Sequence, residues 1–223
     1  MKKTLSLCLA AVALSVSGLA QAQTAGSLVV RVGGTTIMPK VESGYLTAPS
    51  LAGTQIDVKN ASQVTGGVTY FFTDSLAIDV PLGLPFKHDV VGAGAIAGVG
   101  PLGTVKALPI TVMGQFYLGS ATSTFRPYVG AGITYARFMK PKATATLSGL
   151  TGGTPSNPTL LTMKSVAGPS VALGMSVKLG GRWTADGAVN KVLLKTTGTL
   201  STGQTIETTL NPLAVTLSIG YMF

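Results

Sequence analysis

Large apolar side chains occupy every second position through much of this chain. In the closing stretch NPLAVTLSIGYMF, bulky residues alternate with small or flexible ones from Leu213 to Phe223. Successive side chains of a β-strand point to opposite faces, so this period builds strands with one apolar face. Turn residues separate the segments. We expect eight strands, over residues 28–39, 62–72, 76–86, 105–118, 126–138, 166–177, 183–195 and 207–223.

The composition indicates which solvent those apolar faces meet. Charged residues make up 10% of the chain, where about 25% is usual in soluble proteins, and the mean hydropathy is +0.47. After residue 22, no stretch reaches the ~18 consecutive apolar residues of a transmembrane helix. Inside a bilayer every backbone polar group needs a partner, which strands achieve only as a closed barrel. The sequence therefore predicts an all-β fold, an eight-stranded antiparallel transmembrane β-barrel.

The connections between the expected strands alternate in length. The short ones lie near residues 73–75, 119–124 and 178–182, and the longer ones near 40–60, 90–103, 139–164 and 196–205. Short periplasmic turns and longer extracellular loops are typical of outer-membrane barrels. The last strand is expected to pair with the first, because an open edge is not tolerated in hydrocarbon. Its large residues would face lipid, with Tyr221 and Phe223 in an aromatic girdle, and its small ones would fill the narrow lumen.

The first residues are typical of an export signal. Its parts are a basic start, an apolar run and a small-x-small cleavage site, at Lys2 and Lys3, residues 5–16 and residues 20–22. We expect a signal peptide over residues 1–22 and a barrel over residues 23–223, which is 223 − 22 = 201 residues. The only cysteine, Cys8, lies in the signal, which excludes disulfides and thiol chemistry from the mature chain. The predicted location is the outer membrane of a Gram-negative bacterium.

The chain is basic but carries no nucleic-acid signature. Its formal net charge is +9, or 9 − 2 = +7 without the two lysines of the predicted signal. The charges are scattered through loop-like segments and form no basic helix, so we expect no nucleic-acid partner. They have two alternative roles, contact with outer-membrane lipid and the anionic groups of lipopolysaccharide, or solubility of the loops. Nothing in the sequence indicates an oligomeric state.

Several stretches, in this order and spacing, resemble one family of small Gram-negative barrels. They are VVRVGGTTIMPK (29–40), TYFFTDSLAIDVPLGLPFKHDV (69–90), KALPITVMGQFYL (106–118), FRPYVGAGITYARF (125–138) and NPLAVTLSIGYMF (211–223). Together they resemble the outer-membrane protein W (OmpW) family over nearly the whole mature chain. The chain departs from the family pattern at Leu28, where a Trp is usual, and in its Gly/Ala-rich second loop. The resemblance implies an eight-stranded barrel and passive passage of small hydrophobic molecules across the outer membrane.

Three prolines predict a weak place in the barrel wall, because proline has no N–H and interrupts a strand ladder. Pro85 lies about ten residues after the turn at 73–75, and Pro109 about nine residues before the turn at 119–124. They should therefore reach similar heights on paired strands, and Pro81 adds a third break. We expect a lateral gate between the third and fourth strands. The alternative is a bulge or kink that only shapes the barrel.

An uncharged stretch, Val90 to Gly103, joins those two strands. Its apolar side chains predict an entrance loop for hydrophobic solutes, made of Val90, Val91, Ile96, Val99 and Leu102. The expected function is an outer-membrane channel for passive uptake of small hydrophobic molecules, with lateral release into the membrane. The alternative is a surface structural or receptor barrel that binds lipopolysaccharide or protein without transport.

Polar residues with inward parity should lie inside the barrel. They are Asp79, Asp186 and Asn190, with Arg126 or Arg182 as expected partners. The side chains of an eight-stranded barrel nearly fill its interior. We therefore expect these groups to form a structural plug that excludes ions.

His88 is the only histidine and raises the alternative of a lipid-modifying enzyme. Such a site needs a nucleophile or base partner within reach, and the flanking residues Lys87, Asp89 and Val90 offer no nucleophile. We expect a structural histidine and no catalytic residues. A single histidine without cysteine also predicts no metal site, and no motif indicates a cofactor.

Overall fold

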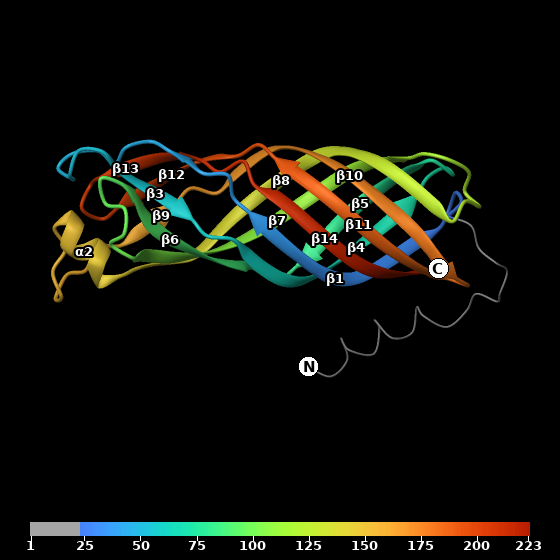
Figure 1. The fold of residues 1–223 in the computed structure, drawn as a ribbon, viewed down its shortest axis with the longest axis horizontal. Helices are drawn as coiled ribbons and strands as arrows, with labels where there is room; N and C mark the ends of the chain where they lie inside the picture. Colours follow the sequence, from blue (N-terminus) through green and yellow to red (C-terminus); the bar gives the residue numbers. More distant parts are fainter. Residues whose placement is uncertain (1–22) are drawn as a thin grey trace, which may run out of the picture.

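The chain forms one long β-barrel (Figure 1). The computed structural model describes residues 23–223, so the signal peptide predicted over residues 1–22 lies outside the described residues. The last strand ends at one end of the barrel, and helix α2 (Ala145–Thr151) lies with the long loops at the other. The predicted all-β class is confirmed.

Eight strands build the wall, one of them as two collinear pieces. They are β1 (Leu28–Met38), β4 (Ala61–Phe71), β5 (Leu76–Gly83) continued by β6 (Phe86–Gly94), β7 (Pro101–Tyr117), β8 (Phe125–Ala143), β10 (Val166–Gly180), β11 (Trp183–Val192) and β14 (Leu213–Met222). Neighbours are antiparallel, and the β1–β14 and β7–β8 ladders close the circle. The predicted barrel is confirmed, including the pairing of the last strand with the first.

The long connections hold more regular structure than the sequence predicts. At the loop end, β2 (Glu42–Ser43), β13 (Thr205–Thr209), β12 (Lys195–Leu200) and β9 (Leu161–Met163) form a four-stranded sheet, and β3 (Thr54–Val58) pairs with β6. The loop expected over residues 90–103 is largely strand, because β6 continues to Gly94 and β7 begins at Pro101. The expected eighth strand is interrupted before β14, where Asn211 has a φ of +32° and Pro212 has no N–H.

The outer wall alternates as the period-two pattern predicts. On β14, Leu217 exposes 70% of its surface, whereas Met222 on the opposite face is buried. At the short-turn end, the rings of Trp183 and Tyr221 lie 5.1 Å apart, and those of Tyr221 and Phe223 lie 4.9 Å apart. This aromatic row occupies the position of the periplasmic girdle of outer-membrane barrels.

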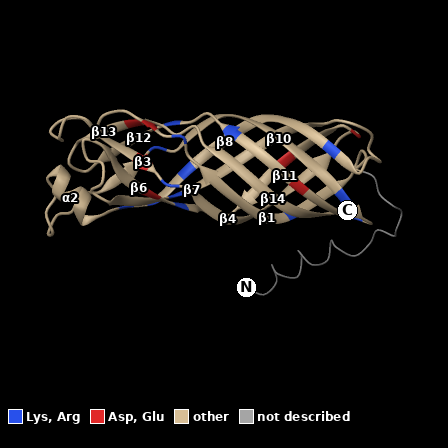
Figure 2. Cartoon of the chain, in the orientation of Figure 1, with Lys and Arg blue, Asp and Glu red and all other residues tan. Residues whose placement is uncertain are grey.

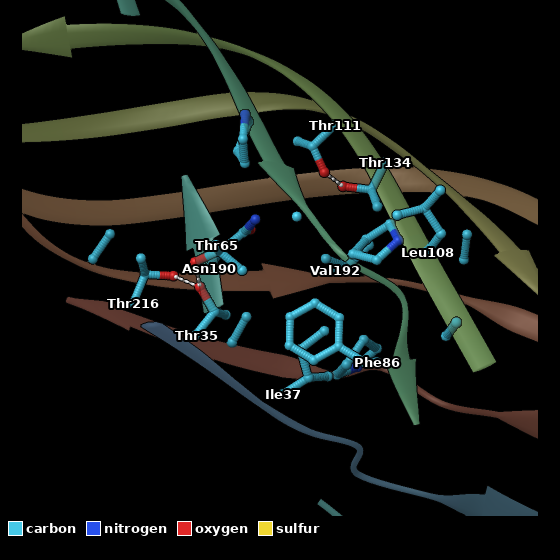
Figure 3. A pocket seen from close by; sticks show the side chains of 18 of the residues that line it. Thr35, Ile37, Thr65, Phe86, Leu108, Thr111, Thr134, Asn190, Val192 and Thr216 are labelled. Atoms are coloured by element: carbon cyan, nitrogen blue, oxygen red, sulfur yellow. Dashed lines mark hydrogen bonds between the residues drawn. The ribbon is translucent and has the colours of Figure 1, made fainter. Parts of the chain in front are cut away.

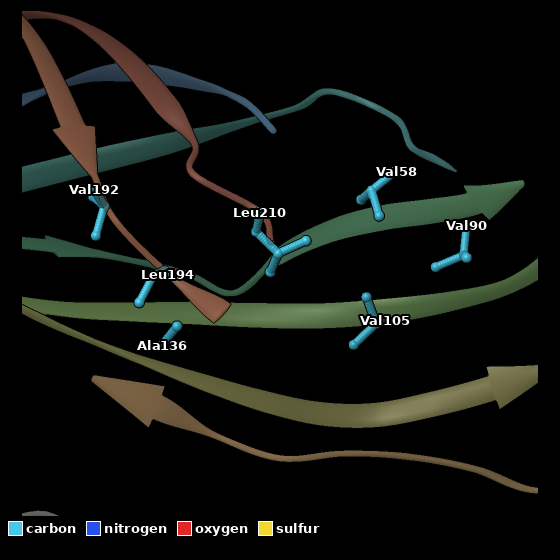
Figure 4. Packing of buried hydrophobic residues seen from close by; sticks show 7 residues of the cluster. All are labelled: Val58, Val90, Val105, Ala136, Val192, Leu194 and Leu210. Carbon is cyan, nitrogen blue, oxygen red and sulfur yellow. The ribbon is translucent and has the colours of Figure 1, made fainter. Parts of the chain in front are cut away.

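Three apolar clusters follow one another along the interior. The periplasmic cluster is Val29, Phe71, Ala77, Tyr117, Tyr128 and Met222. Figure 4 shows the middle cluster, which is Val58, Val90, Val105, Ala136, Val192, Leu194 and Leu210. The extracellular cluster, among the loops, is Ile96, Leu102, Leu147 and Leu200. The interior is therefore apolar from the loop end to the periplasmic end, apart from the polar groups described below.

Charged residues avoid the outer surface of the barrel's middle. Figure 2 shows many of the Lys and Arg residues towards the loop end of the barrel, near β3, β6, β7 and β12. The uncharged belt is the surface that lipid covers in an outer-membrane barrel. Within residues 23–223, no helix is both long enough and apolar enough to cross a membrane.

Candidate functional site

A cavity of about 170 Å³ lies inside the barrel (Figure 3). Most hydroxyls on its wall are already paired: Thr35 Oγ1 lies 2.8 Å from the hydroxyls of both Thr65 and Thr216, and Thr111 pairs with Thr134 at 2.8 Å. Once paired, these threonines present mainly their methyl groups. The cavity is therefore suited to an apolar occupant, although polar residues line parts of it.

The periplasmic side of this cavity is closed by a buried ion cluster. Arg31 on β1 contacts Asp79 on β5 and Asp186 on β11, with its Nη1 3.0 Å from Asp186 Oδ1. Thr69 donates to Asp79 at 2.6 Å, and the Tyr128 hydroxyl donates to Asp186 at 3.1 Å. Separating these charges costs free energy, because each charge is then left buried without a partner. The cluster therefore closes the lumen towards the periplasm.

The partner of the two aspartates differs from the expected one. Both pair with Arg31, whereas Arg126, one of the expected partners, lies beside Tyr117 of the periplasmic cluster. Arg126 donates to the backbone oxygens of Gln23 and Asp74, and its guanidinium lies 5.1 Å from the Tyr117 ring. Strand parity identifies the face of a residue but not the partner across the lumen. Arg31 could have been found as the one charge in its strand, LVVRVGGTTIM.

Asn190 and His88 also line the cavity. Asn190 Oδ1 is buried without a hydrogen-bond partner among the described residues. His88 Nδ1 lies 2.9 Å from the Lys59 carbonyl, and the imidazole stacks on Phe86. Within residues 23–223, no three residues of the types His, Cys, Asp and Glu gather at one point where a metal could bind.

A second chamber of about 60 Å³ lies among the extracellular loops. Of the expected entrance residues, Val90, Ile96 and Leu102 line it, Val91 is half-buried and Val99 is exposed. The sequence does not predict most of the wall of this chamber. Other extracellular segments supply it, with the residues Leu46, Leu51, Leu147, Leu150, Leu161, Leu200 and Ile206. These residues come from several separate segments of the sequence, and only folding of the extracellular end brings the segments together.

The two chambers lie in line and share part of their walls. Val58, Met163 and Leu210 line both. Val58 and Leu210 belong to the middle cluster of Figure 4, and Met163 packs against it. These three apolar side chains therefore separate an outer chamber from an inner one.

The ladder between the third and fourth barrel strands is interrupted beside the inner chamber. The last β5–β7 pair is Asp79 with Met113, and the next pair, now on β6, is Phe86 with Ala107. Residues 80–85 and 108–112 have no ladder partners across this gap. Pro81, Pro85 and Pro109 all lie in these two segments.

The other side of the third strand is interrupted over a different segment. β4 stays paired with β5 up to Thr65 with Gly83, and pairing resumes between β3 and β6 at Val58 with Val90. Pro85 lies within this break as well. Its carbonyl accepts a hydrogen bond of 3.4 Å from the Gln63 side chain. Pro85 is thus the point at which the third strand leaves both neighbours.

The inner cavity reaches the wall at this gap. Leu82 exposes 54% of its surface on the outward face, yet it also lines the cavity. Leu108 and Pro109 line the cavity from the opposite edge. An outward residue of an unbroken ladder is separated from the lumen by the wall. The interrupted segments therefore form a part of the cavity wall in which the third and fourth strands are not bonded to each other.

The comparison with known families decides where the chain belongs. The model of the OmpW family matches residues 24–223. The chain belongs to the OmpW family. Outer membrane protein W of Vibrio cholerae is 31% identical over 204 residues, which is 89% of each chain. The family and its relatives place this OmpW-family barrel in the outer membrane of a Gram-negative bacterium, as predicted.

Two further likenesses are to proteins of Pseudomonas aeruginosa. A protein of Pseudomonas aeruginosa named "Dibenzothiophene metabolism operon protein PahQ" is 25% identical over 80% of each chain. The crystal structure of the outer membrane protein OprG from Pseudomonas aeruginosa superposes with a TM-score of 0.81 at 24% identity, covering 91% of this chain and 99% of OprG. The likeness to OprG supports the fold of this OmpW-family member.

Proposed function

We propose that this barrel admits small hydrophobic molecules passively and releases them sideways into the outer membrane, through the gap between β5/β6 and β7. The observation that carries the proposal is the position of Leu82, Leu108 and Pro109. They line the inner cavity and belong to the segments that lack ladder partners across this gap. The relative PahQ is named for an operon of dibenzothiophene metabolism, and dibenzothiophene is an apolar aromatic compound, which agrees with such a cargo.

The route begins in the outer chamber, among leucines of several loops. It passes Val58, Met163 and Leu210 into the inner chamber and leaves at the gap. A molecule that buries about 150 Å² of apolar surface gains about 4 kcal/mol at 25 cal/mol per Å². Polar solutes gain nothing comparable, so the same walls select for apolar ones.

Lateral release costs less than passage through the periplasmic end. Opening that end requires separating Arg31 from Asp79 and Asp186, and a broken buried ion pair costs about 3–5 kcal/mol. The gap has no ladder bonds to break. Its three prolines also have no N–H, so the open edges carry fewer unpaired donors than other residues would leave in contact with hydrocarbon.

A cross-link across the gap tests this route. Cysteines at Val80 and Val112, on facing edges of the gap, would be joined by a short linker with a thiol-reactive maleimide at each end, in a chain that has no other cysteine after Cys8. The control is a pair at Val129 and Leu173, which face each other on the intact β8–β10 ladder. We expect uptake of a labelled small aromatic compound to be lost with the gap cross-link and kept with the control. Unchanged uptake through a cross-linked gap would refute lateral release there.

We infer no enzymatic role for this barrel. The His88 ring is buried, and its Nδ1 is occupied by the Lys59 carbonyl. The family relative from Vibrio cholerae is named for its location and not for a reaction. Lipid A should therefore be the same in cells with and without the protein, and a protein-dependent change in its mass spectrum would contradict the inference.

A further inference from the structure

Three cations lie side by side on the outer wall, on three consecutive strands. Lys87 on β6 is directly opposite Lys106 on β7. Lys106 is opposite Met139 on β8, so Arg137 is its diagonal neighbour on the same outward face. All three residues are exposed. We call Lys87, Lys106 and Arg137 the cationic patch.

The cations of the patch outnumber the carboxylates beside them. The ion pairs within residues 23–223 join Arg31 to two aspartates and Lys59 to Asp57, and none includes a member of the patch. Asp89, the nearest outward carboxylate on the same strand, is paired with Thr104 and is therefore the diagonal neighbour of Lys106, so a single carboxylate borders the three cations. Like charges directly across a ladder destabilise the pairing. The arrangement is therefore one that an external anion would relieve.

The patch lies directly beyond the lipid-facing belt. Ile110 on β7 and Tyr135 on β8 are exposed residues towards the membrane and are paired with each other, and Leu84, just before β6, is exposed as well. Ile110 lies four residues from Lys106, about 14 Å along β7 at 3.4 Å per residue. Figure 2 shows this change from an uncharged belt to Lys and Arg beside β6 and β7. A cationic surface next to an apolar one fits an anionic lipid better than a free anion.

We propose that the cationic patch binds the phosphate groups of lipid A, the lipid anchor of lipopolysaccharide, with the acyl chains along the adjoining apolar belt. Ammonium and guanidinium groups form strong charge-assisted hydrogen bonds with phosphate, and the guanidinium of Arg137 can do so with two parallel N–H groups. The alternation of the strands presents all three cations to the same headgroup. This proposed lipid site is inferred only from residues on the outer surface of the barrel, so it does not depend on the proposed transport.

The patch also borders the gap in the wall. Lys87 and Lys106 form the next ladder pair beyond Phe86 and Ala107, the pair that ends the gap. A lipid held by the patch would therefore lie beside the proposed exit. Lipid binding and solute uptake are nevertheless separate measurements, so either proposal can fail alone.

The test compares charge-matched double variants of the full barrel in detergent. K87Q with K106Q removes the facing pair. The control, K40Q with K164Q, removes two exposed lysines from segments that are not ladder neighbours. Each variant is extracted from the outer membrane, and native mass spectrometry measures its bound lipid A. The purified barrels are then titrated with bisphosphorylated lipid A, dephosphorylated lipid A and phosphatidylglycerol.

We expect the wild type and the control to bind bisphosphorylated lipid A, and K87Q/K106Q to bind it about tenfold more weakly, which corresponds to about 1.4 kcal/mol. The variant K87R with K106R should retain binding, because it keeps both charges. Heat-modifiable gel mobility verifies folding of each barrel. Equal binding by K87Q/K106Q and the control would overturn the proposal. Equal affinity of the wild type for dephosphorylated lipid A, or for phosphatidylglycerol, would also overturn it.

Discussion

A single residue, Arg31, holds together the ion cluster that closes the periplasmic side of the lumen. Its guanidinium joins β1 to Asp79 on β5 and Asp186 on β11, and the two carboxylates accept further hydrogen bonds from Thr69 and Tyr128. Parity in the sequence is enough to put both aspartates inside a barrel. It does not identify Arg31 as their partner, because the contact crosses the lumen instead of following a ladder.

Replacing Arg31 alone should therefore destabilise the barrel strongly. R31M leaves two buried carboxylates without their cation, and we expect a loss of about 3–5 kcal/mol in the free energy of unfolding. The triple variant R31M/D79L/D186L removes all the charges together and should recover most of that loss. Urea unfolding in lipid vesicles measures both. A triple variant as unstable as R31M would show that the charges are not the cause.

His88 gives the barrel a pH dependence of definite sign. It lies on β6 beyond the lipid-facing belt, and burial lowers the pKa of its imidazole below the ordinary 6.5, with partial opposition from the Lys59 carbonyl and Asp89. The nearby charged side chains of Lys59, Lys87 and Asp89 are all exposed on the outside. As the pH falls, the unfolded chain therefore takes up the proton first.

The contribution of His88 to stability is thus complete above pH 6.5 and declines below it, towards the lower pKa of the folded state. We predict that the free energy of unfolding falls more steeply on acidification in the wild type than in H88Q, which keeps a side-chain donor for the Lys59 carbonyl. Urea titrations in micelles at several pH values below neutral would check this. Parallel profiles for the two proteins would contradict it.

The third barrel strand is the element whose interruption matters most. Before the break, Leu82 and Leu84 point outwards, and after it Phe86 and His88 point inwards. Even-numbered residues therefore change from the outer face of the barrel to the inner face at the break. The prolines are visible in the sequence. The extent of the gap is not, because it depends on the registers of β4 and β7 on either side. For the same reason, Val90 and Leu102 read as loop residues although they belong to strands.

Restoring the missing donors should narrow the gap. In the double variant P85A/P109A, both residues regain an N–H and can extend the ladder between the third and fourth strands. We expect uptake of apolar solutes to fall several-fold, while the barrel becomes no less stable. P155A/P158A, two exposed prolines in the loop between α2 and β9, is the matched control. Wild-type uptake by a correctly folded P85A/P109A barrel would show that the prolines only shape the wall.

At the scale of the whole molecule, the barrel has two unlike ends. The extracellular end carries an apolar chamber, and the periplasmic end is sealed by Arg31, Arg126 and the aromatic residues around them. The spanning strands could be predicted from the alternation of apolar residues, because lipid imposes that pattern on one face. The outer chamber could not, because its leucines come from several loops that the sequence does not align.

Uptake by whole cells is the first measurement to make on the proposed transport. Cells that lack the protein, and the same cells after it is supplied again, would be given a labelled small aromatic compound, with heat-modifiable gel mobility as the measure of a folded barrel. We predict faster uptake once the barrel is restored. Equal uptake with a folded barrel in the outer membrane would contradict transport and favour a structural or receptor role.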